Sequence, residues 1–108
     1  MSEVDFNKIL DLDKVIHERA RLGIMAALSA SQTLSFQEIK QALKVTDGNL
    51  SVHLRLLEKN NYLVVEKNFV GRKPCTTYRL TQQGRDAFKS YIESLEKLIQ
   101  TIQSEDIK

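Results

Sequence analysis

The 108-residue sequence has few of the residues on which several classes of protein depend. Its single cysteine, Cys75, excludes an internal disulfide. With only two histidines, His17 and His53, it also lacks the clustered ligands that metal sensing requires. No apolar run reaches the roughly 18 residues that a membrane span needs. We therefore expect no metal, no cofactor and no membrane partner.

Signals for export and for catalysis are missing as well. The first residues, MSEVDFNKIL, do not show the basic-then-apolar pattern of a secretion signal, so we expect a protein of the reducing cytoplasm. There is no Ser-His-Asp set, no pair of carboxylates in a cleft-forming context and no phosphate-cradling glycine loop. An enzyme is thus the least supported class. Because repeats, low-complexity segments and separable linkers are also missing, we expect one domain over residues 1–108.

The positive charge is concentrated in the middle of the chain, although the net charge is only +2. Lys and Arg number 6 against 7 Asp and Glu in residues 1–52, 7 against 2 in residues 53–85, and 3 against 5 in residues 86–108. Such a basic segment is typical of a nucleic-acid-binding face. A solvated surface with a chance imbalance is the plainer alternative.

The periodicity predicts helix, short helix, helix, hairpin and helix. Apolar spacing predicts an N-terminal helical region over residues 5–31, with a bend or break near His17. Residues 35–60 form a helix-turn-helix candidate, in which Ser35 and Glu38 make a capping box and Thr46 caps the second helix. Residues 62–80 read as a β-hairpin with a loop over about 70–75, longer than a two-residue turn. A last helix covers residues 82–103.

A helix-turn-helix followed directly by a β-hairpin is the arrangement of a winged helix. The predicted fold class is therefore mainly α with a β-hairpin (α+β): a winged helix-turn-helix with N- and C-terminal dimerisation helices. The hairpin is the wing.

The second helix of the helix-turn-helix has the pattern of a helix that enters a DNA groove. Leu50, Leu54 and Leu57 share its apolar side, and the opposite side is small or basic and carries no acid. Small residues allow close approach, and cations meet phosphates. We predict DNA contacts from this helix and from the wing, at Asp47, Gly48, Asn49, Ser51, Val52, His53, Arg55, Lys59, Arg72 and Lys73.

Individual roles follow from side-chain chemistry. Asn49 can hydrogen-bond an adenine edge, and Arg55 can contact guanine or phosphate. Val52 can contact a thymine methyl group, or it is simply one of the exposed apolar residues that are normal on surfaces. Gly48 suits close approach to the backbone or a frayed first turn. His53 lies about 60° from the apolar side, so a half-buried, hydrogen-bonded position is the alternative to a DNA contact.

The wing carries two adjacent cations, Arg72 and Lys73. Beside a groove-bound helix they would contact phosphates or a narrow minor groove, and Pro74 would limit the entropy lost on docking. The alternative is that a loop tip carries cations only for solubility.

The segment TDGNLSVHLRLLEKNNYLVVEKNFVGRKPCTTYRLTQQG closely resembles winged-helix transcriptional regulators of the MarR and ArsR type, especially small stand-alone proteins of this kind. The likeness extends from LDKVIHERARLGIMAAL through the last helix. It implies a dimeric DNA-binding regulator in which residues 47–55 form the reading segment and Arg72 and Lys73 the wing contacts. The sequence departs from the family pattern at Arg19, where relatives often have Pro, and at Cys75, where they often have a basic residue.

The last helix has a heptad seam, with apolar residues at alternating spacings of four and three. We expect homodimerisation through Phe88, Ile92, Leu95, Ile99 and Ile102; the alternative is that part of this seam folds back on the core of its own chain. The function predicted is a sequence-specific, double-stranded DNA-binding transcriptional regulator acting as a homodimer. The alternative is a winged-helix adaptor that binds protein. No motif identifies an effector, and Cys75 lacks a resolving cysteine for a redox role.

Overall fold

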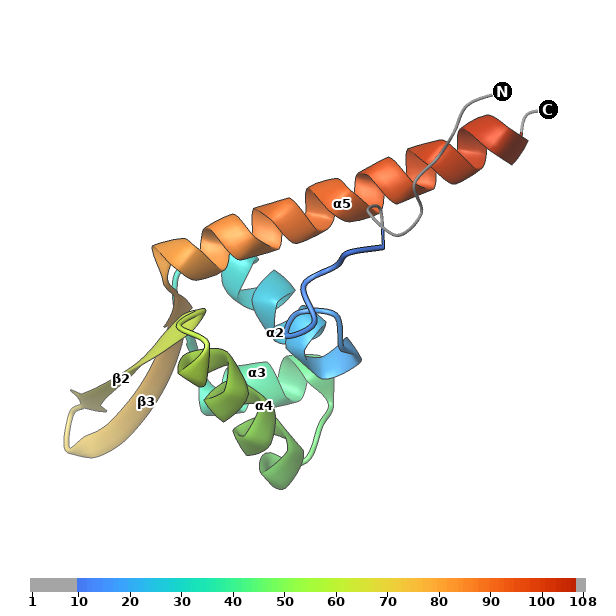
Figure 1. The fold of residues 1–108 in the computed structure, drawn as a ribbon. Helices are drawn as coiled ribbons and strands as arrows, with labels where there is room; N and C mark the ends of the chain where they lie inside the picture. Colours follow the sequence, from blue (N-terminus) through green and yellow to red (C-terminus); the bar gives the residue numbers. More distant parts are fainter. Residues whose placement is uncertain (1–9, 107–108) are drawn as a thin grey trace.

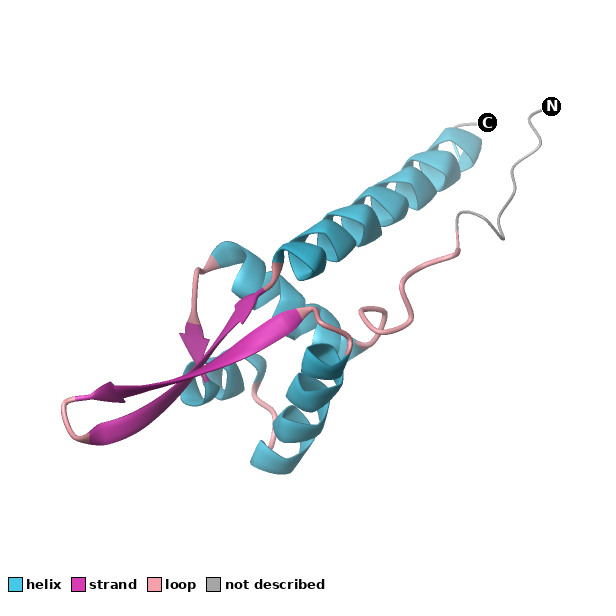
Figure 2. Ribbon diagram, turned by 60° about the vertical axis from the view of Figure 1, so that its left-hand side comes forward, coloured by secondary structure: helices cyan, strands magenta, loops and turns pink. Residues whose placement is uncertain are grey.

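The computed structural model describes residues 10–106 (Figure 1). Within them the order of elements is α2 (Arg19–Ala30), β1 (Leu34–Ser35), α3 (Phe36–Leu43), α4 (Asp47–Lys59), β2 (Leu63–Val70), β3 (Lys73–Leu80) and α5 (Gln82–Asp106). The predicted α+β winged helix-turn-helix is confirmed. Helix α5 lies along one side of the molecule, whereas α4 and the β2–β3 wing project to the other side (Figures 1 and 2).

The core is entirely apolar or aromatic among the described residues. It is formed by Ile16, Ile24, Met25, Leu28, Ile39, Leu50, Leu54, Leu57, Leu63, Tyr78, Leu80 and Tyr91. These side chains come from the segment before α2, from α2, α3 and α4, from the inner face of the sheet and from α5, so one cluster joins every larger element. Each fully buried aliphatic side chain contributes roughly 1.5–3 kcal/mol. The core therefore holds α4 and the wing in a common frame.

The helix-turn-helix forms as the capping signals predict. The Glu38 backbone N–H donates to Ser35 Oγ at 3.1 Å, and the Ser35 N–H donates to Glu38 Oε1 at 2.8 Å, which completes the capping box of α3. Helix α3 ends at Lys44, whose φ of 55° is left-handed. Thr46 then caps α4 by accepting a hydrogen bond from the Asn49 N–H at 3.2 Å.

The predicted N-terminal helix over residues 5–31 is wrong for residues 10–18, which form turns, bends and irregular backbone. Residues 5–9 lie outside the described part. Asp13 Oδ1 accepts from the N–H groups of Val15 and Ile16, at 2.8 and 3.1 Å, and this local turn competes with a helix. Glu18 is extended, with φ −156°, and caps α2. Helical spacing misled the prediction because Ile16 is buried from a non-helical segment.

Two tyrosines hold this N-terminal segment against the body. His17 Nδ1 lies 2.8 Å from the Tyr91 hydroxyl on α5, and the Tyr62 hydroxyl donates to Asp13 Oδ2. Burial, together with the hydrogen bond to Asp13 and its charge, raises the pKa of Tyr62 to about 12.

The three strands form an antiparallel sheet in the order β1-β3-β2 (Figure 2). The register pairs Leu63 with Leu80 at the body and Val70 with Lys73 at the wing tip, leaving a two-residue turn of Gly71 and Arg72. The predicted longer loop is wrong. Gly71 has a φ of +65°, and glycine at the first turn position is typical of a type II′ hairpin turn.

Pro74 misled the loop prediction because proline usually interrupts strands. In a hairpin closed by Val70 and Lys73, the next pair, Phe69 and Pro74, is one that exchanges no backbone hydrogen bonds. The backbone nitrogen of Pro74, which carries no hydrogen, therefore points to the edge of β3 away from β2. That edge is open here because β1 pairs only with Thr77 and Tyr78.

Candidate nucleic-acid interface

Helix α4 presents the outer face that its sequence predicts. Leu50, Leu54 and Leu57 are buried, while Val52, Arg55 and Lys59 are exposed on the other side. Val52 is 57% exposed. A shallow hollow of about 270 Å³ follows this face, lined by Val52, Arg55, Leu56 and Lys59. Its mixture of an apolar floor and two cations suits a base edge flanked by phosphates.

The first turn of α4 is open to solvent. Asp47, Gly48 and Asn49 are exposed, Ser51 is half-buried, and a Cβ built on Gly48 would meet no atom within 4 Å. The Asp47 carboxylate forms an ion pair with Lys40 of α3, with Oδ1 and Nζ 2.7 Å apart. This lysine offsets the one acidic charge in the predicted DNA-binding set.

His53 is turned away from the outer face of α4. Its Nδ1 lies 3.0 Å from Arg21 Nη1 and 3.6 Å from Glu18 Oε1, both at the start of α2, and its side chain is mostly covered. The structure thus gives His53 the half-buried, hydrogen-bonded position that was the alternative to a DNA contact.

Glu18 is the centre of this cluster. Its Oε1 accepts from the Arg21 N–H at 2.8 Å. Partial burial would raise the pKa of Glu18, but backbone hydrogen bonds from Arg21 and Ala20, with the charges of His53 and Arg21, lower it below 4.5 overall. The cluster therefore ties the back of α4 to the N-terminus of α2.

The wing carries its cations at the tip. Arg72 occupies the turn and Lys73 begins β3, and both are exposed. The adjacent stretch from Lys67 to Arg85 contains five Lys or Arg residues and no acid. In residues 10–106, Lys67, Arg72 and Lys73 form no ion pair, whereas Arg79 Nε lies 3.1 Å from Glu66 Oε1. The positive charge of the tip is thus available to an external anion.

Two apolar side chains at the wing tip are more exposed than the sequence predicts. Phe69 and Val70, next to the turn, are 74% and 70% exposed. The sequence predicts Phe69 as the end of a strand and Val70 as the first residue of the loop. The signal that could have revealed them is their distance from the body, since a strand pair closed by a two-residue turn carries its last side chains beyond the core.

The predicted dimerisation seam divides along α5. Phe88 and Leu95 are half-buried and pack against the core, so the first part of the seam does fold back on its own chain. Ile92, which lies between them in the sequence, is 36% exposed. Ile99 and Ile102 are 51% and 50% exposed where α5 extends past the body (Figure 1). The exposed part of the seam is therefore its distal end.

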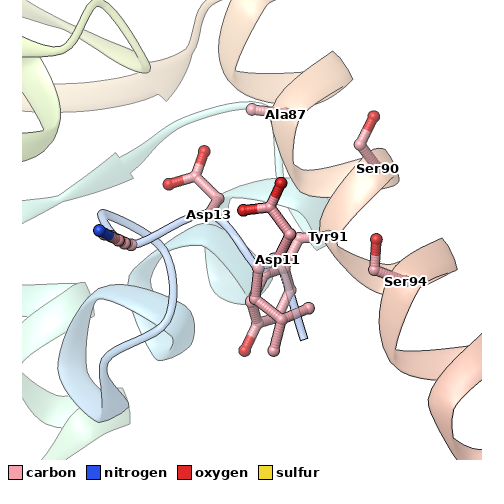
Figure 3. A pocket seen from close by; sticks show the side chains of 8 residues that line it. Asp11, Asp13, Ala87, Ser90, Tyr91 and Ser94 are labelled. Atoms are coloured by element: carbon pink, nitrogen blue, oxygen red, sulfur yellow. The ribbon is translucent and has the colours of Figure 1, made fainter. Parts of the chain in front are cut away.

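A cavity of about 480 Å³ lies between the N-terminal segment and α5. Figure 3 shows Asp11 and Asp13 on the segment side and Ser90, Tyr91 and Ser94 on the helix side. In the described part of the chain no three His, Cys, Asp or Glu residues are placed to hold a metal ion. Within the same residues, no helix combines the length and apolar character required to span a bilayer.

Residues 20–99 match the family model of the winged helix DNA-binding domain. The chain belongs to this family. Its fold and its resemblance to MarR-type regulators, expected from the wing and the preceding helix, are confirmed.

One related sequence and two solved structures are similar to this chain. The uncharacterized protein MJ0432 of Methanocaldococcus jannaschii is 32% identical over 90 residues, which are 83% of this chain and 98% of that protein. The transcriptional regulator homologue protein from Pyrococcus horikoshii OT3 is 29% identical, with a TM-score of 0.81 over 90% of this chain and 95% of the other. A putative MarR-family regulator from Enterococcus faecalis V583 shares the fold, with a TM-score of 0.73, 24% identity and coverages of 99% and 96%. Family and fold are those of transcriptional regulators rather than enzymes.

Proposed function

We propose that this winged-helix protein is a homodimeric transcriptional regulator that binds double-stranded DNA in a sequence-specific manner. Helix α4 enters the major groove, and the wing contacts the neighbouring backbone or minor groove. One observation carries the proposal: α4 and the wing project to the same side of the body, and Arg55, Lys59, Arg72 and Lys73 are exposed there (Figure 1). A duplex offers phosphates on both flanks of a groove, which matches cations on two separate elements.

The proposed reading residues lie on the first three turns of α4. Asn49, Val52 and Arg55 are exposed. In this proposal Asn49 bonds an adenine edge, Arg55 contacts guanine or phosphate, and Val52 contacts a thymine methyl group. Gly48 leaves room for close backbone approach. Asp47 and His53 contribute less directly, because Asp47 is paired with Lys40 and His53 with the start of α2. Ser51 also contributes less directly, because it is half-buried.

Dimerisation is proposed through the distal part of α5. Ile99 and Ile102 expose apolar surface that a second α5 would cover, and the seam continues toward the core through Leu95, Ile92 and Phe88. Two-fold pairing would place two α4 helices in successive major grooves, which predicts a near-palindromic operator. The protein-binding adaptor is not favoured, since the outer face of α4 carries the exposed cations Arg55 and Lys59 beside the exposed Val52.

The test is duplex binding as a function of salt. Duplexes are selected from a random pool by the full chain and titrated by fluorescence anisotropy. The double variant Arg72→Ala/Lys73→Ala should weaken binding to all sequences and flatten the slope of log K against log salt by up to about 2. The control Lys89→Ala/Lys97→Ala removes the same charge from α5 and should leave the slope unchanged. Absence of duplex binding by the unmodified protein in low salt would overturn the proposal.

A further inference from the structure

The wing tip carries an apolar surface that phosphate contacts do not explain. Phe69 is the most exposed of the large apolar side chains in the described part of the chain, at 74%. It belongs neither to the core nor to the half-buried side chains packed against the core. Pro74, which pairs with Phe69 in the sheet, is exposed as well, and adjoining exposed apolar side chains on a projecting hairpin indicate a contact outside the monomer.

The strand register places Phe69 on the inner face of the wing. Side chains alternate along a strand, so Phe69 shares a face with Val65 and Leu63, which pack into the body. Pro74 lies opposite Phe69 on the same face, in a pair whose Cβ atoms are about 4.5–5.5 Å apart. Val70 and Lys73 lie on the outer face. Phe69 and Pro74 thus form an apolar edge at the wing tip, separated from the packed part of the same face by the pair Lys67 and Thr76.

The surrounding charge identifies the kind of partner. Lys67, Arg72 and Lys73 flank this edge, and none of them pairs with an acid in residues 10–106. Two such tips would repel each other, which argues against a second copy of the chain as the occupant. A polyanion with an apolar interior fits instead. Duplex DNA is such a partner, because its stacked bases lie between two rows of phosphates.

We propose that Phe69, supported by Pro74, enters the minor groove as an apolar wedge and partly unstacks one base step. Arg72 and Lys73 hold the flanking phosphates while the wedge bends the duplex. Unstacking is easiest at flexible pyrimidine–purine steps, so the wing favours such a step beside the sequence read by α4. This inference rests on the proposed DNA binding and adds a specificity determinant to it.

The test compares Phe69→Ala with Val70→Ala, its equally exposed neighbour on the opposite face. Duplexes of about 30 base pairs, selected by the full chain, carry dyes at both ends to report bending and 2-aminopurine at a pyrimidine–purine step to report unstacking. Phe69→Ala should lose the bend and the 2-aminopurine signal and bind about 10-fold more weakly, since wedging and stacking contacts are removed. Its salt slope should stay unchanged, because no charge is lost. Val70→Ala should match the unmodified protein, and Phe69→Leu should retain most of the bend.

The outcomes separate the wedge from DNA binding itself. If the unmodified protein binds duplex and Phe69→Ala binds and bends it equally well, the wedge is wrong and the proposed function stands. If the unmodified protein binds no duplex, both fail. If Phe69→Ala instead changes the sedimentation of the free protein, Phe69 belongs to a protein contact and the wedge is likewise overturned.

Discussion

Gly84, in the first turn of α5, lies directly against the backbone carbonyl of Tyr62, and a Cβ added to Gly84 would overlap that oxygen. The same carbonyl accepts a hydrogen bond from the Thr81 N–H at 3.1 Å. Thr81 Oγ1 in turn accepts from the Gly84 N–H at 2.9 Å and donates to the Asn61 carbonyl at 2.6 Å. The start of α5 is therefore anchored where α4 passes into β2, and this contact sets the direction of α5 relative to the helix-turn-helix.

Replacing Gly84 with alanine should destabilise the fold. The added methyl group meets backbone rather than a flexible side chain, so relief requires a shift of α5, and we expect a loss of about 1–3 kcal/mol in the free energy of unfolding. Urea unfolding followed by circular dichroism measures it. The control is Gly48→Ala in α4, where the new methyl group meets nothing and helix propensity should raise stability by about 1 kcal/mol. Unfolding of Gly84→Ala at the same urea concentration as the unmodified protein would show that α5 is not anchored here.

Local signals predicted the helix-turn-helix well. The capping box of Ser35 and Glu38, the Thr46 cap and the apolar side of α4 all act over a few residues, so sequence reading finds them. The prediction of a helix in the N-terminal region was wrong because the burial of Ile16 depends on contacts distant in sequence. The Asp13 turn replaces the helix there. The prediction of a longer wing loop was wrong because β3 tolerates Pro74 at a position that the short strand β1 does not reach.

The orientation of some site residues depends on tertiary contacts that the sequence does not show. Helical spacing put His53 between the two faces of α4, and only the start of α2, more than thirty positions earlier in the chain, decides which way it turns. Similarly, the seam of α5 is continuous in sequence. Its division into a packed part and an exposed part depends on where the body of the molecule ends (Figure 1).

Glu18→Gln should reduce stability in a pH-dependent way. The pKa of Glu18 in the folded chain lies below 4.5, so its charge adds stability that is complete above about pH 4.5 and is lost as the pH falls through the folded-state value. Because Glu18 is partly exposed, we expect a difference of less than about 1 kcal/mol near neutral pH. Glutamine keeps an oxygen to accept from the Arg21 N–H, which isolates the effect of charge. Urea unfolding across the acidic range should show the two proteins converging at low pH; a constant difference would mean that the charge of Glu18 is not involved.

Arg55→Ala should alter which sequences the protein prefers. If Arg55 contacts a guanine edge, its loss should cost about 1–3 kcal/mol at that base pair and relax the preference there. If it contacts phosphate, affinity should fall evenly and the salt slope should decrease by about 1. Selection from a random duplex pool, followed by anisotropy at several salt concentrations, distinguishes these results. Lys97→Ala on α5 is the matched single-charge control, and a neutral Arg55→Ala would shift the reading role to Asn49 and Val52.

Ile99→Glu should convert the proposed dimer into monomers without unfolding the chain. Ile99 is half exposed and lies where α5 has left the body, so a buried charge would arise only in the dimer, where it is strongly unfavourable. Leu95 is a poorer test position because it also packs against the core of its own chain. Sedimentation velocity measures the assembly, and circular dichroism confirms that the helices remain. Gln100→Glu adds the same charge on the opposite side of α5 and should leave the dimer intact. A dimer that survives both Ile99→Glu and Ile102→Glu would place the interface on another surface.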